Sequence, residues 1–145
     1  MPSERMRLDQ QVERYAYFDA SAIVKLAVVE RETAALEANV AQRAGLLTSR
    51  LGVTEVRRAA RRASGGRRLI QQVEDVIEAF VVIDMTPAMF ERAGELGPST
   101  LRTLDALHLA AALTLDVPLM DFITYDVRLA AAARAHGLTV ASPGA

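Results

Sequence analysis

Short, mostly apolar runs alternate along this chain with longer segments in which apolar residues recur every three or four positions. The short runs lie at residues 15–18, 46–48, 80–83, 122–124 and 138–140. The runs at 15–18 and 80–83 contain no polar residue, which is typical of strands buried on both faces of a sheet, whereas residues 138–140 predict a last edge strand. The longer segments predict helices at about residues 20–29, 30–44, 49–63, 67–79, 87–97, 103–115 and 126–136.

Strands and helices that alternate at these lengths predict a parallel sheet covered by helices on both faces. We therefore expect an α/β protein, built as a three-layer α/β/α sandwich with a short, mostly parallel sheet of four to five strands. Residues 15–145 hold all of these elements and predict one domain. Residues 1–14 are polar and mixed in charge, which predicts an N-terminal leader without the apolar stretch of a signal peptide.

The composition is that of an ordinary globular protein. The chain has 145 residues, of which 51% are hydrophobic and 24% charged, and its net charge is −1 at pH 7. Bulk charge therefore predicts no nucleic-acid partner. The absence of cysteine excludes disulfides, thiolate metal sites and a cysteine nucleophile, and it fits a cytoplasmic protein. No apolar stretch approaches the 18 residues of a membrane span.

Four carboxylates stand where a parallel sheet would bring them to one edge. Asp19 directly follows the first apolar run and Asp126 lies just past the fourth, while Glu55 and Asp105 lie near the starts of predicted helices. In open α/β sheets the carboxyl ends of the strands form the usual ligand-binding edge. A helix cap would explain Asp19 by itself, but the recurrence of the pattern predicts an acidic cluster.

An acidic cluster of this kind requires a cation. A buried, unpaired carboxylate is costly, and four together also repel one another. No run of lysines or arginines lies next to these acids to neutralise them all, so a divalent metal ion is the simplest explanation. Ligands that are all oxygen atoms favour Mg²⁺ or Mn²⁺ over zinc.

Four segments resemble the acidic motifs of PIN-domain nucleases, and most closely those of the VapC toxins of bacterial and archaeal toxin–antitoxin pairs. The segments are YFDASAIVKL around Asp19, TSRLGVTEV around Glu55, LRTLDALHLA around Asp105 and ITYDVRL around Asp126. Each is a weak signal, but all four occur in the family's order and spacing. The resemblance runs from Tyr15 to Pro143. In this family the first strand usually begins at the N-terminus, so the polar leader leaves Met1 and Met6 as alternative starts.

The resemblance implies a metal-dependent endoribonuclease, the toxin component of a toxin–antitoxin system, that cleaves structured RNA such as tRNA or rRNA. It also implies a homodimer that is silenced by a cognate VapB-like antitoxin, whose tail enters the acidic groove. A metal-activated water would hydrolyse the phosphodiester bond, so no protein nucleophile is needed.

The resemblance also implies a role for each site residue. The catalytic and metal-binding quartet would be Asp19, Glu55, Asp105 and Asp126. Asp19 and Asp105 would bind Mg²⁺ (or Mn²⁺) directly. The other two acids would bind a second ion or act through water, and Ser21 and Thr124 would be supporting hydroxyls.

Several other side chains leave two readings open. Four arginines share one face of the helix at residues 49–63: Arg57, Arg58, Arg61 and Arg62. This face either contacts RNA or the antitoxin or is simply solvated. His108 is a metal ligand or acid, or a packed and hydrogen-bonded core residue. Lys25 either reaches a phosphate or extends from a buried helix to solvent.

Simpler structural roles are expected for Tyr17, a core residue, and for Asp84, Asp116 and Asp121, which are expected to be cap or turn residues. Two alternative functions remain. A haloacid-dehalogenase-like phosphohydrolase would need a second acid two residues after Asp19, where this chain has Ser21. A catalytically inactive PIN-like module that binds RNA or protein is disfavoured because all four acids are present.

Overall fold

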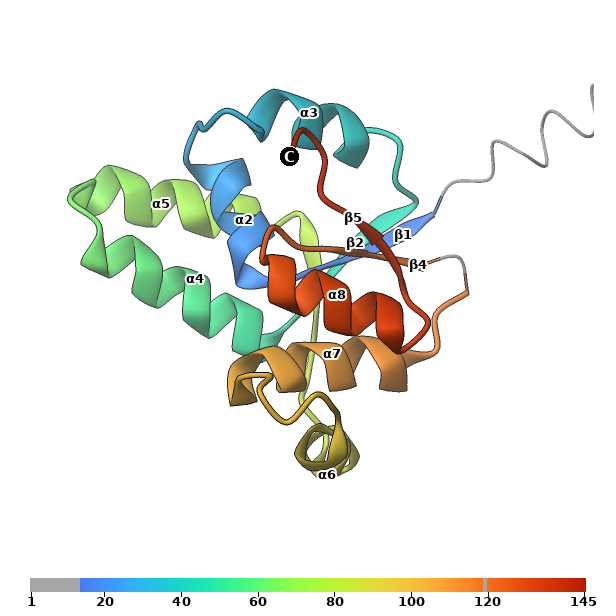
Figure 1. Cartoon of the computed structure of the whole chain (residues 1–145). Coiled ribbons are helices and arrows are strands. Elements are labelled where there is room, and N and C mark those ends of the chain that lie inside the picture. Colours follow the sequence, from blue (N-terminus) through green and yellow to red (C-terminus); the bar gives the residue numbers. More distant parts are fainter. Residues whose placement is uncertain (1–13, 119) are drawn as a thin grey trace, which may run out of the picture.

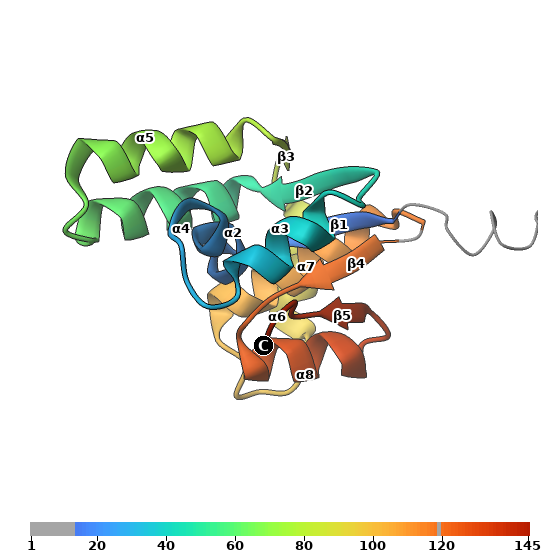
Figure 2. The ribbon, with the colours of Figure 1, turned by 90° about the horizontal axis from the view of Figure 1, so that it is seen from above.

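The computed structural model describes residues 14–118 and 120–145. Five strands form one sheet in which all neighbouring strands run parallel, in the order β3-β2-β1-β4-β5; Figure 2 shows this order from above. The strands are β1 (Tyr15–Phe18), β2 (Gly45–Ser49), β3 (Phe80–Ile83), β4 (Met120–Ile123) and β5 (Thr139–Ala141). The expected α/β class and parallel sheet are confirmed.

Seven helices in the described residues cover the two faces of the sheet (Figure 1). They are α2 (Ala20–Ala27), α3 (Thr33–Val40), α4 (Arg50–Arg62), α5 (Gly66–Ile77), α6 (Pro87–Glu95), α7 (Thr103–Leu115) and α8 (Val127–Ala135). Helices α2 to α5 pack with Ala16 and Phe18 on one face. Helices α6 to α8 pack with Tyr17 on the other. Successive residues of β1 thus bury opposite faces, as strand alternation requires.

The helix starts follow the capping rules. The side chains of Ser49, Thr86 and Asp126 each accept a hydrogen bond from a backbone amide in the first turn of the helix that follows. Pro87 occupies the first position of α6, where a missing N–H group costs nothing. Within residues 14–118 and 120–145, no helix is long and apolar enough to cross a membrane.

Two expected elements differ from the structure. The helix expected at residues 30–44 is shorter, because residues 30–32 form a turn in which Thr33 Oγ1 accepts from the Glu30 amide (2.9 Å) and donates to the Lys25 carbonyl (2.7 Å). The third strand was expected to be buried on both faces, and this prediction is wrong. β3 is an edge strand, and Val81 is 60% exposed.

Asp121 is neither a cap nor a turn residue. It lies inside β4, is buried, and binds two arginines that are distant in sequence. Arg14 Nε donates to its Oδ1 atom at 2.8 Å, and Arg43 Nη1 donates to Oδ2. The Arg43 side chain is only 8% exposed. Because β4 is a central strand, this ion cluster joins the start of β1 and the segment before β2 to the sheet interior.

Replacement of Asp121 should therefore destabilise the fold. The Asp121→Ala variant would leave the buried Arg43 guanidinium without its carboxylate, and an uncompensated buried charge costs about 3–5 kcal/mol. Asp84→Ala is the control, because Asp84 pairs with Arg50 where both side chains are more than 70% exposed and such a pair contributes about 1 kcal/mol or less. Urea unfolding measures both, and similar values for the two variants would contradict a structural role for Asp121.

Candidate active site

The carboxyl ends of β1 and β4 define the candidate active site. These strands are neighbours, but the chain continues from β1 to β2 on one side and from β4 to β5 on the other. Such a change of direction opens a ligand-binding crevice at the ends of the strands. Asp19 follows β1 and caps α2, whereas Asp126 follows β4 and caps α8. Asp105 lies in the first turn of α7, so three positive helix ends carry three of the predicted acids.

Asp19 is held by three donors. Ser21 Oγ (2.6 Å) and the Ala22 amide (3.0 Å) donate to Oδ1, and Thr124 Oγ1 donates to Oδ2 at 2.6 Å. Only 4% of Asp19 is exposed. Each carboxylate oxygen accepts about two hydrogen bonds, so Oδ1 is saturated by these donors while Oδ2 has room for one further partner. Ser21 and Thr124 therefore fix the orientation of the carboxylate and leave one oxygen available.

The ionised form of Asp19 is disfavoured as the protein stands. Burial raises the pKa of this carboxyl group above its ordinary value, and the hydrogen bonds from Ser21 and Thr124 lower it only in part. A group in this condition is stabilised as an anion by a nearby cation.

Arg102 bridges the other two helix-start acids. Its Nε atom donates to Asp105 Oδ2 (3.2 Å) and its Nη2 atom to Asp126 Oδ2 (3.1 Å). Burial and then the charge of Asp126 raise the pKa of Asp105, and Arg102 opposes this shift. The Arg102 side chain is 75% exposed. No run of basic residues lies beside the acids in the sequence, and the role of this single arginine was not predicted; its position three residues before Asp105 is the local signal for the pair.

Glu55 is oriented by a buried hydrogen-bonded chain. His108 Nε2 contacts Glu55 Oε1, and the other ring nitrogen, Nδ1, lies 2.9 Å from the Tyr17 hydroxyl. That hydroxyl also bonds Ser49 Oγ at 3.0 Å. Because an ionised carboxylate only accepts hydrogen bonds, the His108 Nε2–H group donates to Glu55. Tyr17 is buried, which confirms its expected core role, and His108 is buried and hydrogen-bonded, as the second of its two readings requires.

The four acids are neighbours, but their side chains do not meet at one point. Thr124 Oγ1 links Asp19 Oδ2 to the Asp126 amide (3.1 Å). Arg102 links Asp126 to Asp105, whereas Glu55 is paired with His108. Among residues 14–118 and 120–145, no three aspartate, glutamate or histidine side chains are grouped closely enough to hold a metal ion.

The donor set nevertheless fits a hard divalent cation. The available ligands are carboxylate oxygens, which Mg²⁺ and Mn²⁺ prefer. Burial raises the pKa of two of these acids, Asp19 and Asp105, and the charge of Asp126 adds to the shift of Asp105. A guanidinium group already lies between Asp105 and Asp126, so this position accepts a cation.

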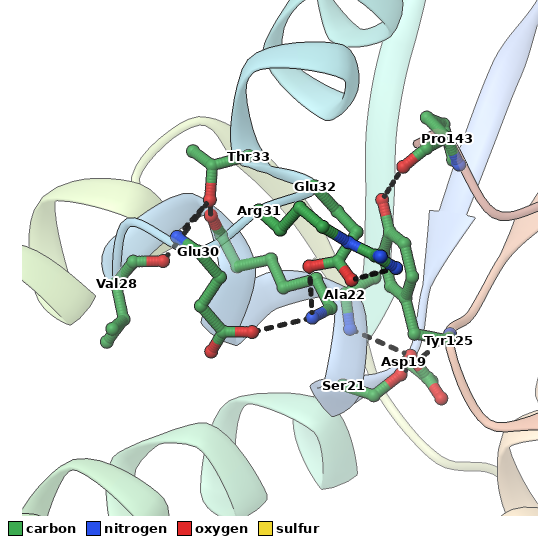
Figure 3. Close-up of polar contacts among 11 residues, drawn as sticks. Asp19, Ser21, Ala22, Val28, Glu30, Arg31, Glu32, Thr33, Tyr125 and Pro143 are labelled. Atoms are coloured by element: carbon green, nitrogen blue, oxygen red, sulfur yellow. Dashed lines mark hydrogen bonds and ion pairs between the residues drawn. The ribbon is translucent and has the colours of Figure 1, made fainter. Parts of the chain in front are cut away.

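Lys25 lies beside the site in an ion-pair cluster with Glu30 and Glu32; Figure 3 labels these two acids and the neighbouring Tyr125. Its ammonium group lies 2.6 Å from Glu30 Oε2, 3.0 Å from Glu32 Oε2, and 4.8 Å from the centre of the Tyr125 ring. The Tyr125 amide in turn donates to Ser21 Oγ at 3.0 Å. This ion-pair cluster joins the loop after α2 to the loop that follows β4. Through Tyr125 it supports the Ser21 hydroxyl, which holds Asp19.

The predicted basic face lies on α4, which projects with α5 beyond the sheet in both views (Figures 1 and 2). Arg57 is already engaged, because its Nε and Nη2 atoms donate to the two carboxylate oxygens of Glu74 at 2.8 and 3.0 Å. The other three arginines, Arg58, Arg61 and Arg62, are exposed.

Comparisons with known proteins agree with this fold. Residues 16–135 match the family model described as PIN domain. Two curated proteins of Mycobacterium tuberculosis are similar to most of the chain. Ribonuclease VapC46 is 40% identical over 134 residues, covering 88% of this chain and 96% of the relative. Ribonuclease VapC47 is 36% identical over 133 residues, covering 89% and 97%.

Solved structures share the fold at low sequence identity. VapBC2 from Rickettsia felis, bound to a DNA fragment from its promoter, has a TM-score of 0.70 at 12% identity and covers 88% of this chain and 97% of that one. VapC20 from Mycobacterium tuberculosis, described as a Sarcin-Ricin loop cleaving toxin, has a TM-score of 0.69 at 16% identity and covers 88% and 99%. At these identities the similarity concerns the fold alone.

The raised pKa of Asp19 gives the metal-free protein a pH-dependent stability. Below the ordinary value of 3.8 the carboxyl group is protonated in both folded and unfolded chains. As the pH rises above that value the unfolded chain ionises first, so the folded state loses about 1.4 kcal/mol for each unit by which the folded pKa is raised. Asp19→Asn removes this loss, and its stability relative to wild type should increase as the pH rises above about 4.

Urea unfolding with EDTA present measures this difference. Added Mn²⁺ should stabilise the wild type more than the Asp19→Asn variant, because a ligand that binds the folded state raises its stability. A stability difference that does not change with pH would contradict the account of Asp19.

The position of Arg102 predicts competition with a divalent cation. Arg102→Ala removes the positive charge between Asp105 and Asp126, so it should tighten Mn²⁺ binding severalfold in calorimetric titration. Arg92→Ala is the control, because it changes the net charge equally from the exposed surface of α6. Weaker Mn²⁺ binding by Arg102→Ala than by Arg92→Ala would show that Arg102 supports the metal site instead of competing for it.

Proposed function

This chain belongs to the PIN domain family and to its VapC ribonucleases, and we propose that it is the toxin of a toxin–antitoxin pair and cleaves RNA with the acids at the ends of β1 and β4. The observation that carries the proposal is the placement of Asp19, Asp105 and Asp126 at the starts of three helices around the change of direction in the sheet. The PIN match and the VapC relatives favour this activity over a haloacid-dehalogenase-like phosphohydrolase.

Each site residue has a distinct part in this proposal. Asp19 and Asp105 bind Mg²⁺ or Mn²⁺ directly, and Ser21 and Thr124 hold the Asp19 carboxylate so that Oδ2 faces a ligand. Asp126 and Glu55 would bind a second ion or act through water. When bound, the metal supplies a water molecule of lowered pKa and neutralises charge on the phosphodiester.

The chain's own groups supply positioning and electrostatics. Asp126 is fixed by its hydrogen bond from the Leu129 amide (2.9 Å), and Glu55 by His108. The N-terminal ends of α2, α7 and α8 add partial positive charge where a phosphate would lie. Such fixed charges need no rearrangement during reaction, which is the main way that protein groups stabilise a charged transition state.

The proposed partners follow from the family. We expect a cognate VapB-like antitoxin that blocks the acidic site, a homodimer, and action in the cytoplasm, where cellular RNA is available. Exposed Arg58, Arg61 and Arg62 on α4 are proposed to contact the RNA backbone or the antitoxin, because guanidinium groups pair well with phosphate and carboxylate. Arg57 would first have to leave Glu74.

Replacement of Asp105 tests the proposed activity. Asp105→Asn keeps the size of the side chain but removes its charge, so RNA cleavage in Mg²⁺ or Mn²⁺ should fall by about 100-fold or more. The assay is cleavage of total cellular RNA with mapping of new ends, with and without chelator. Expression of the wild type alone should arrest growth, and expression of Asp105→Asn should not.

Glu91→Gln is the matched control, since Glu91 is an exposed carboxylate on α6 outside the site and its replacement should leave cleavage unchanged. Thermal unfolding of both variants establishes that they are folded. Full cleavage by Asp105→Asn would refute the assigned role. A wild type that binds RNA and cleaves none would indicate the inactive binding module instead.

A further inference from the structure

A pocket of about 640 Å³ opens directly beside the acids. One wall is the loop of residues 98–102 that leads into α7, and the other is one face of α8. Arg102 and Asp105 belong both to this pocket and to the acidic site. A ligand with one functional group bound at the acids can therefore place the adjoining part of the same molecule in the pocket.

The pocket has an apolar floor and a basic edge. Leu101 and the small side chains of Ala131 and Ala135 provide apolar surface, and Arg102 and Arg128 also line the pocket. A flat apolar surface suits the face of a nucleobase, and guanidinium groups both stack on bases and pair with phosphates. The volume lies within the range of sites for small organic ligands, so a nucleoside fits.

We propose that this pocket binds the base of a nucleotide next to the scissile phosphate of an RNA substrate. The inference rests on the proposed ribonuclease function and adds a subsite to it. Because Asp105 belongs to both the pocket and the acidic site, the pocket adjoins the acids as a subsite for the next nucleotide would, and its two arginines suit a polyanionic backbone. The pocket thereby contributes to the choice of cleavage site.

A pocket-filling variant tests this subsite. Ala131 and Ala135 lie four residues apart on an exposed face of α8, so the double variant Ala131→Leu, Ala135→Leu fills the pocket and keeps strong helix formers. The control is Ala34→Leu, Ala38→Leu, with the same spacing and exposure on α3. Circular dichroism and Mn²⁺ titration of both should match wild type, since none of these residues is one of the acids.

The probes are a fluorescent ten-nucleotide RNA of mixed sequence and a ribose-phosphate decamer of the same length without bases. Binding is measured by anisotropy with chelator present, so that no probe is cut. The filled variant should bind the RNA about tenfold more weakly, the loss expected for one stacked base, and should bind the baseless decamer as wild type does. The α3 control should bind both probes normally.

Mapping of cut sites in total RNA completes the test. The filled variant should lose a nucleotide preference at one position beside the cut that wild type and the α3 control share. Unchanged RNA affinity would overturn the proposal and leave the pocket to a protein ligand, and equal losses on the two probes would overturn it in favour of backbone contact. A wild type that binds RNA but makes no cuts would refute the ribonuclease function, and the binding results would still decide whether the pocket accepts a base.

Discussion

Negative charge concentrated at one edge of the sheet is the constraint on which this site depends. Parallel strands bring their carboxyl ends together, and the helices that follow begin there, so the acids at those positions become neighbours. Each acid has its own partner: hydroxyl groups and an amide hold Asp19, Arg102 holds Asp105 and Asp126, and His108 holds Glu55. These contacts orient the carboxylates but do not neutralise all of them.

Asp121 is a buried acid with a structural role, and its partners differ from those of Asp19. Asp121 is also buried, yet two guanidinium groups bind its two oxygens and it holds the sheet together. Asp19 is equally buried, and its neutral donors offset only part of the effect of burial, so its pKa is raised. A buried acid without a cationic partner lowers stability, which is the pattern expected where binding of a cation is part of the function.

Local sequence patterns predicted much of this fold. Apolar runs located all five strands, helix caps such as Thr86 with Pro87 located helix starts, and the motifs placed the acids at one sheet edge. What the sequence did not reveal are contacts between distant segments. Asp121 binds Arg14, which lies 107 residues away in the sequence, and His108 contacts Glu55, which lies 53 residues away. No local periodicity encodes such pairs, and an edge strand such as β3 reads like a buried one because strand order is a tertiary property.

The central claim is that the acids at the ends of β1 and β4 bind a divalent cation. Anomalous diffraction from crystals grown with Mn²⁺ tests it most directly, because it locates the ion without reference to activity. An anomalous peak in contact with Asp19 Oδ2 and with Asp105, together with a displaced Arg102 side chain, is the expected result. Fully bound Mn²⁺ at another place, with Arg102 still bridging Asp105 and Asp126, would contradict it.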